Sequence, residues 1–322
     1  MIMIGKYNRI LWPLLFAQIV ITGIVYFYTG ILRGPDVPRM LLTLDGNSVE
    51  TLRIIGPGEK SVLLEKAKKS GEWGLPEFDG FPANSQAVAQ LIDRLTNTEL
   101  GMQVSKQADS FDRMKVADNN FERKVEIGKA SEMKTIFFGS APALRQAHAR
   151  LSGEKIVYAV KFAPGDIDLK ASDWIKKDLL IVDENKVQTV MAGNIKIQRT
   201  QDVNLDRQEV SKPAWKLFIN NKPAETQDDE KVDEFVKEIA DMQIDSIGSD
   251  ADIRNVSKKN TFLISLELEG DNKIEYRFAK LNGEEDYLMT TSSRPESFRL
   301  PPLASQKLLE LSRPNSLIKK AD

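Results

Sequence analysis

The chain of 322 residues is 41% hydrophobic and 29% charged, which is typical of folded protein, and it is long enough for two domains. Its net charge is −2, and the basic residues are spread along the chain without a stripe, so no nucleic acid is expected as a partner. The chain has no cysteine, which excludes disulfides and thiolate-bound metal.

The first part of the chain predicts a membrane anchor. Residues 10–32 are 23 consecutive residues without a charge, and at about 1.5 Å per residue such a helix crosses a hydrocarbon core of roughly 30 Å. Lys6 and Arg9 precede the run and no acidic residue does, so the positive-inside bias places residues 1–9 in the cytoplasm. Residues 33–42 are expected to form a short proline-stiffened stalk that leads to the extracytoplasmic remainder.

A cleaved signal peptide is the alternative to this anchor. The apolar region of such a peptide is shorter, about 7 to 15 residues, and no Ala-x-Ala-like cleavage site follows the run. An uncleaved anchor is therefore favoured. Within it, the amide of Gln18 is costly in hydrocarbon unless it is paired. Gln18 is thus a candidate contact for a partner helix, although a single span also tolerates one amide.

A repeat of about 140 residues follows the stalk. The segment 48–54, SVETLRI, resembles 186–192, KVQTVMA, and Trp73-Gly74-Leu75 resembles Trp215-Lys216-Leu217. After each tryptophan comes an amphipathic helix whose apolar residues have the i, i+3, i+4, i+7 spacing of one buried face. These faces consist of Val88, Leu91, Ile92 and Leu95, and of Val232, Phe235, Val236 and Ile239. The repeat predicts two extracytoplasmic units, residues 43–183 and 184–322.

Each copy continues with strands. Alternating apolar residues around a polar turn predict hairpins over 121–141 and 260–281. A further strand is expected at 153–160, aligned with 283–290, and a short helix closes each copy, over 168–180 and 302–312. The predicted fold class is α+β: an N-terminal transmembrane helix followed by two repeated domains, each an antiparallel sheet covered by an amphipathic helix.

The first copy has an insert that the second lacks, residues 76–84, PEFDGFPAN. Loops on a rigid scaffold often carry recognition, so Phe78, Asp79 and Phe81 are candidate partner contacts, and an exposed apolar patch is expected around the two phenylalanines. The alternative is a turn whose phenylalanines seal the end of the helix. Trp73, which recurs in the second copy, is expected to pack in the core.

No constellation of catalytic or metal-binding residues is recognised. His148 is the single histidine, which argues against a histidine-paired nucleophile or a two-histidine metal site and favours a turn or surface position. Residues 55–60, IGPGEK, lack the spacing of a phosphate-binding loop and predict a hairpin turn. The acidic segments 227–234 and 245–252 do not match a calcium loop. We therefore expect no enzyme activity, no cofactor and no bound metal.

Three segments carry a resemblance to a known family, namely WGLPEFDGFPAN, RLSGEKIVYAV and SDWIKKDLL. They resemble the bacterial domain-of-unknown-function family number four thousand three hundred and forty, which is encoded beside gliding-motility-type ABC transporters. The resemblance extends over nearly the whole part after the anchor. It implies a bacterial inner-membrane accessory component that acts with an ABC-type permease, an ATPase and a second large extracytoplasmic subunit, and it supplies no catalytic residue.

Two functions of different classes follow from these features. The leading hypothesis is a non-enzymatic accessory subunit, held in the lipid by its single span, whose repeats serve as a protein-interaction scaffold for an ABC-transporter-type complex. The alternative is an extracytoplasmic receptor that binds a glycan, peptide or lipid between the two repeats, because ligand sites favour domain interfaces.

Overall fold

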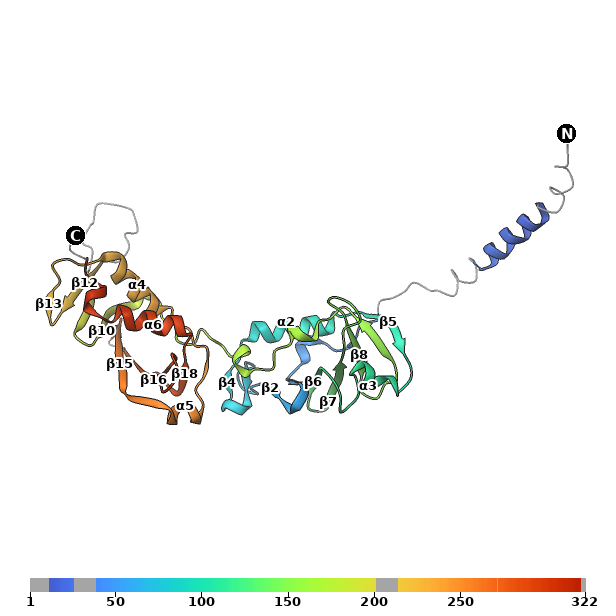
Figure 1. The fold of residues 1–322 in the computed structure, drawn as a ribbon, viewed down its shortest axis with the longest axis horizontal. Helices are drawn as coiled ribbons and strands as arrows, with labels where there is room; N and C mark the ends of the chain where they lie inside the picture. The colour runs from blue at the N-terminus through green and yellow to red at the C-terminus, as the bar shows by residue number, and fades with distance from the viewer. Residues whose placement is uncertain (1–11, 26–38, 201–213, 271, 320–322) are drawn as a thin grey trace, which may run out of the picture.

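The computed structural model of the chain describes residues 12–25, 39–200, 214–270 and 272–319. Residues 12–25 form a helix, and the other described residues form two β-rich units that follow one another along the long axis of the molecule (Figure 1).

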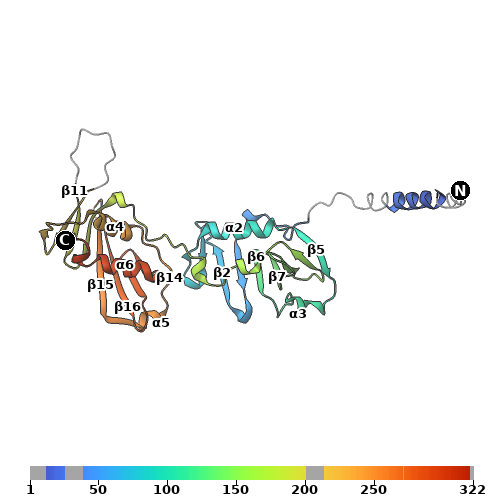
Figure 2. The ribbon, with the colours of Figure 1, turned by 45° about the horizontal axis from the view of Figure 1, so that its top comes forward.

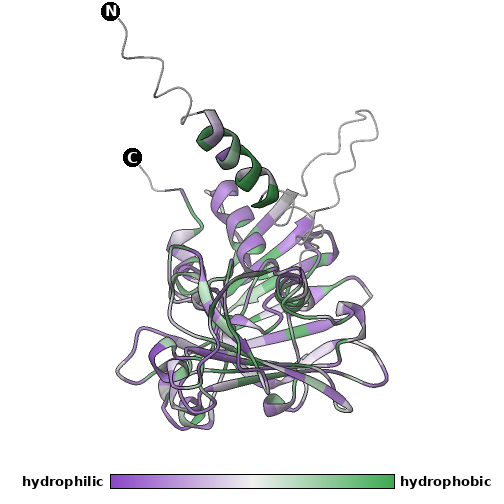
Figure 3. Cartoon of the chain, turned by 90° about the vertical axis from the view of Figure 1, so that its right-hand side faces the viewer, coloured by the Kyte–Doolittle hydropathy of each residue, from purple (hydrophilic) through white to green (hydrophobic). Residues whose placement is uncertain are grey.

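The predicted membrane span, residues 10–32, lies partly outside the described residues. Residues 1–9 and most of the stalk lie outside them entirely. The described part of the span is helical and largely hydrophobic (Figure 3). No helix among the described residues has both the length and the apolar character needed to cross a bilayer. The full span therefore stays a prediction from the sequence.

The first unit is a nine-stranded antiparallel sheet in the order β4-β3-β2-β1-β6-β7-β8-β9-β5. Its strands are β1 (Thr51–Ile55), β2 (Ser61–Lys66), β3 (Trp73–Leu75), β4 (Phe81–Pro82), β5 (Leu100–Ser105), β6 (Arg123–Lys129), β7 (Glu132–Phe138), β8 (Ala147–Leu151) and β9 (Val157–Val160).

The second unit is also a nine-stranded antiparallel sheet, in the order β13-β12-β11-β10-β15-β16-β17-β18-β14. Its strands are β10 (Val187–Ala192), β11 (Ile195–Thr200), β12 (Ala214–Ile219), β13 (Lys222–Pro223), β14 (Ser246–Ile247), β15 (Val256–Leu268), β16 (Lys273–Leu281), β17 (Tyr287–Thr291) and β18 (Arg294–Arg299).

The two strand orders are the same when β1 is matched with β10 and the others follow in chain order. The two antiparallel sheets predicted from the repeat are thus confirmed. The predicted hairpins are also present, as β6 with β7 and β15 with β16. One alignment is corrected, because β9, in 153–160, takes the sheet position of β18, whereas the strand in 283–290 is β17, the counterpart of β8.

Amphipathic helices cover the sheets as expected (Figures 1 and 2). The helix α2 (Ser85–Thr96) buries the four predicted residues of its apolar face, and α4 (Asp229–Ala240) buries its own four together with Ala240. In the second unit α6 (Pro302–Leu311) lies beside α4, where the Lys307 ammonium contacts two glutamates of α4 at 2.9 and 2.8 Å. Two shorter helices, α3 (Ser110–Met114) and α5 (Asp250–Arg254), occupy equivalent places in the two copies.

The helix predicted over 168–180 is wrong, because only the short 3₁₀ turn Ala171–Asp173 forms there. The backbone that follows is paired with the corner between β4 and α2 instead. Lys176 N–H donates to the Pro82 carbonyl at 2.9 Å, and the Trp174 carbonyl accepts from Asn84 N–H at 2.7 Å. Backbone groups engaged in this way are not available for the i to i−4 ladder of an α-helix.

The two units are joined by continuous packing. The Phe81 ring of the first unit lies 6.0 Å from the Phe298 ring of the second, centroid to centroid, and the Arg294 guanidinium lies 5.4 Å from the Phe81 centroid. Two backbone hydrogen bonds reinforce the junction, from Val182 N–H to the Ala240 carbonyl at 2.8 Å and from Ile244 N–H to the Lys177 carbonyl at 3.0 Å. Buried apolar residues of both units form one hydrophobic cluster.

Candidate functional site at the junction of the repeats

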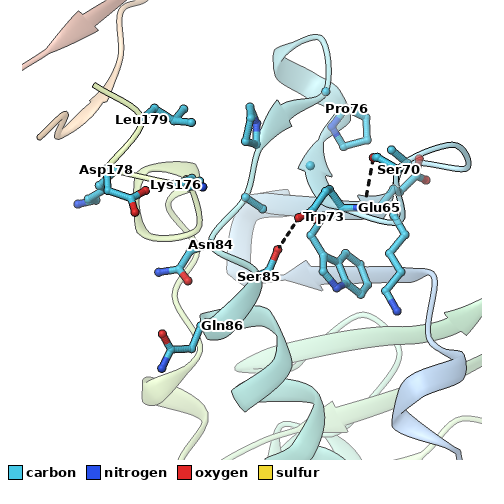
Figure 4. A pocket seen from close by; sticks show the side chains of 18 of the residues that line it. Glu65, Ser70, Trp73, Pro76, Asn84, Ser85, Gln86, Lys176, Asp178 and Leu179 are labelled. Carbon is cyan, nitrogen blue, oxygen red and sulfur yellow. Dashed lines mark hydrogen bonds between the residues drawn. The ribbon is translucent and has the colours of Figure 1, made fainter. Parts of the chain in front are cut away.

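A groove of about 1090 Å³ opens where the first sheet ends and the connection to the second unit begins (Figure 4). One side is made by the ends of β2, β3 and β4 and by the start of α2. The other side is made by residues 176–179 of the connection, and Gln243 of the second unit completes it. We call this site the junction groove.

The floor of the junction groove is a row of directly paired residues across three strands. Glu65 of β2 pairs with Gly74 of β3, and Gly74 pairs with Pro82 of β4. Glycine is required at position 74 because the backbone of Gly80 lies close to it: a Cβ atom at position 74 would be 2.9 Å from the Gly80 carbonyl oxygen. Gly74, which has no side chain, therefore separates Glu65 from Pro82.

The wall at the start of α2 is fixed by a cap and a strand bridge. The Asn84 side chain accepts from Ala87 N–H at 3.1 Å, which is the usual bond of an N-cap residue. Ala83 forms an isolated antiparallel bridge with Ile175, so the connection and the sheet edge hold each other. Ser85 and Gln86, the first residues of α2, face the groove from this rigid corner (Figure 4).

Several charged residues of the groove already have partners. The Lys66 ammonium lies 5.3 Å from the Trp73 ring centroid and donates to the Asn47 carbonyl at 3.5 Å. Lys177 contacts Asp245 at 3.7 Å, and the Ser85 hydroxyl donates to the Glu72 carboxylate at 3.5 Å.

The remaining charges of the groove are exposed. Glu65, Lys176 and Asp178 show no ion pair within 4 Å among the described residues. The junction groove thus presents unpaired charges of both signs together with the amides of Asn84, Gln86 and Gln243. Such a surface can accept several hydrogen bonds and ion pairs from a polar ligand.

The insert contributes to the groove in a way the sequence does not predict. Phe81 is buried, with 2% of its surface exposed, so the expected exposed patch is corrected: this ring packs at the junction of the repeats. Phe78 is half-buried against the core. Asp79 is exposed in a left-handed conformation, φ +53°, at the turn that joins β3 and β4.

These three candidate contacts are therefore close to the junction groove without lining it. The insert supplies Pro76, Gly80, Pro82, Ala83 and Asn84 to the lining instead. Gln18, the fourth candidate, is exposed on the helix over 12–25 and is not among the lining residues. Trp73 and Trp215 are buried, which confirms their predicted place in the core.

Residues 176–179 were not predicted to line a site, because residues 168–180 were predicted to form a helix. Their signal in the sequence is the pair of lysines and the aspartate immediately before the boundary between the repeats. The connection instead forms a turn at residues 177–180, and residues 176–179 make one side of the groove (Figure 4).

One serine–histidine contact exists elsewhere in the first unit, and His148 is half-buried in β8 rather than in the expected turn or surface position. Ser140 Oγ lies 3.1 Å from His148 Nδ1, and the same hydroxyl is 3.2 Å from the Met114 carbonyl. Burial is the main cause that lowers the pKa of His148. No acidic side chain is bonded to this imidazole among the described residues, so the pair lacks the third group that orients a catalytic histidine.

Buried Arg150 was also not recognised as a structural residue. Its guanidinium lies between the rings of Phe111 and Phe137, at 4.6 and 4.5 Å from their centroids, and donates to the Val116 carbonyl at 2.7 Å. It also contacts Asp118 at 2.5 Å. These bonds offset the cost of burying the Arg150 charge beside the small second hydrophobic cluster of the first unit.

No group of three or more acidic, histidine or cysteine side chains is placed to hold a metal ion within the described residues.

A family model described as a domain of unknown function (DUF4340) matches residues 73–262, more than half of the chain. The match includes the insert, the connection between the repeats and most of the lining of the junction groove, whose residues on β2 and on the loop before β3 precede it. It is shorter than the resemblance noted from the motifs. No curated protein and no solved structure matches the chain.

Proposed function

The chain belongs to the DUF4340 family, and on that premise we propose that it is a non-enzymatic accessory subunit of an ABC-transporter-type complex in the bacterial inner membrane. The uncharged run at 10–32 would anchor it with the N-terminus in the cytoplasm. Its partners would be an ABC-type permease, an ATPase and a second extracytoplasmic subunit, as the resemblance implies.

The observation that carries this proposal is the junction groove. It is an open groove whose lining exposes apolar surface together with unpaired charges and amides, and such a mixture suits recognition of another protein. The two repeats are held together beside it by the Phe81–Phe298 contact and by backbone hydrogen bonds. A rigid pair of domains outside the membrane is a suitable scaffold for the assembly of other subunits.

The first test is recovery of partners from the native membrane. The full-length tagged chain is solubilised in a mild detergent, and co-purifying proteins are identified by mass spectrometry, beside a chain with an unrelated anchor and a chain with Gln18→Leu. An ATPase and a permease recovered in stoichiometric amounts would support the proposal. Recovery of the chain alone would contradict it.

A second candidate function is favoured by the position of the same groove beside the junction of the repeats. It is a receptor for an extracytoplasmic ligand, and the lining points to a peptide among the three ligand classes expected. A sugar is commonly held against an exposed aromatic face, but Trp73, the single aromatic residue lining the groove, is 5% exposed. A lipid chain would use the apolar part of the lining alone, whereas a peptide can contact that part together with the charged and amide side chains.

Thermal denaturation of the full-length chain in detergent, with and without ligand, separates the two candidates. We expect short mixed-charge peptides to raise the melting temperature under the receptor function and cell-wall glycan fragments to leave it unchanged. A shift with glycans alone would contradict the argument from the lining residues.

A further inference from the structure

The four edges of the two sheets differ in how they are protected. An edge strand exposes unpaired backbone groups, and proteins usually blunt it by shortness, proline, charge or a cover. Three of the edges follow this rule, since β4, β13 and β14 have two residues each. Two of these carry a proline, and β4 is also bridged by the connection through Ile175.

The fourth edge, β5, lacks most of this protection. It has six residues, Leu100–Ser105, with no proline and no charge. The side chains of Met102 and Val104 are 76% and 36% exposed. Its pairing with β9 shifts register twice, which is the one protective irregularity it shows. In the second repeat the equivalent strand is β14, of two residues, so the long edge is particular to the first repeat.

The outer edge of β5 already accepts a strand at its beginning. Leu100 N–H donates to the Arg39 carbonyl at 2.7 Å, and Leu41 N–H donates to the Thr98 carbonyl at 2.7 Å. Met40 and Glu99 form the antiparallel bridge between these two bonds. Residues 101–105 continue the same edge beyond this pairing, and no outer strand is paired with them among the described residues.

The sequence of this free edge is self-complementary. In an antiparallel pair of two copies centred on Gln103, Gln103 faces its own equivalent, Met102 faces Val104, and Gly101 faces Ser105. Apolar side chains therefore meet apolar ones, and no like charges are brought opposite each other. The partner strand would end at Ser105, opposite Gly101, just before the place where Arg39 occupies the edge.

We propose that a second copy of this chain pairs its β5 antiparallel with β5 through residues 101–105, which joins the two first repeats into one sheet around a two-fold axis at Gln103. Such an axis is the common symmetry of homodimers. The interface is small for free chains, so it is expected to form where anchoring in one membrane raises the effective concentration. In this respect alone it rests on the proposed anchor.

The absence of cysteine from the chain permits a direct test by disulfide cross-linking in native membranes. Directly opposite residues of antiparallel strands have Cα atoms about 4.5 to 5.5 Å apart, which suits a disulfide. Gln103→Cys should therefore give a cross-linked dimer on addition of a mild oxidant. A mixture of Met102→Cys and Val104→Cys chains in one membrane should do so too.

Two controls define the register. Ser105→Cys alone places the two thiols four residues apart along the strands, about 13 Å, and should cross-link at least tenfold less. Leu144→Cys, at a side chain that is 91% exposed, measures random collision. All five positions are exposed or half-exposed, so the fold should tolerate the substitutions.

A dimer that forms with Gln103→Cys and with the mixture, but not with the controls, supports the proposal. Cross-linking of Gln103→Cys no greater than that of Leu144→Cys overturns it, as does equal cross-linking at 103 and 105. A thiol at 103 that reacts neither with a second copy nor with a maleimide means that something else covers the edge, and this also overturns it. None of these readings depends on recovery of an ATPase or permease.

Discussion

Individual side chains at the junction show why the insert looks like a recognition loop in sequence. Phenylalanine residues in a turn-rich segment resemble an exposed patch, but Phe81 is turned inward because the second repeat packs against it through Phe298 and Arg294. A contact between residues more than two hundred positions apart leaves no local pattern. What could be predicted was the core role of Trp73, since it recurs in the second copy.

Replacing Phe81 by alanine should destabilise the chain by about 3 to 5 kcal/mol, the cost of removing a buried phenylalanine and leaving a cavity. The free energy of unfolding from chemical denaturation measures this. Phe78→Ala, at a half-buried ring in the same insert, is the matched control and should cost clearly less. Equal losses for the two variants would contradict the burial that distinguishes them.

The lowered pKa of His148 predicts that the free energy of unfolding depends on pH. Burial lowers the pKa of this imidazole in the folded state, so below pH about 6.5 the unfolded chain binds the proton more readily and stability falls as the pH decreases. His148→Gln removes this contribution. The free energy of unfolding of the variant should therefore decrease less between pH 7 and pH 5, about the range of an ordinary histidine. The same decrease in both proteins would show that His148 is not responsible.

At the scale of elements, the helices α2 and α4 and the hairpins were predictable, because apolar periodicity and polar turns are local signals. The segment 168–180 was not, because its backbone pairs with residues about ninety positions away, at Pro82 and Asn84. Tertiary pairing of this kind overrides a local helical pattern. The junction groove depends on that same pairing, which is why its lining residues could not be assembled from the sequence.

The start of α4 provides a prediction that is independent of the groove. The Asp228 side chain caps the helix by accepting from Lys231 N–H at 3.3 Å. Asp228→Ala should lower the free energy of unfolding by about 1 kcal/mol, whereas Asp228→Asn, which keeps an acceptor, should have little effect. Denaturant titration of the three proteins decides this, and an equal loss for alanine and asparagine would contradict a capping role.

For the whole molecule, the duplication predicted from short resemblances corresponds to two sheets with the same strand order. The way in which the copies join was not predictable, since the contacts of Phe81, Val182 and Ile244 across the junction have no equivalent within one copy. The shared hydrophobic cluster indicates that the copies support each other. Recognition by the groove would depend on this mutual support.

Calorimetry tests the mutual support of the repeats. Because their buried residues form one cluster, the full-length chain in detergent should unfold in a single transition, and Phe81→Ala should shift that whole transition to lower temperature. Two separate transitions, of which the variant moves one, would show that the repeats are independent domains.

The central claim is that the junction groove holds a protein partner of the membrane complex, and comparative co-purification tests it most directly. Gln86→Trp places a large side chain in the groove, and Gln90→Trp places it at an exposed position of the same helix outside the groove. We predict that the unaltered chain and Gln90→Trp recover the same ATPase and permease from native membranes and that Gln86→Trp loses them at least tenfold. Equal recovery with all three chains would contradict the claim.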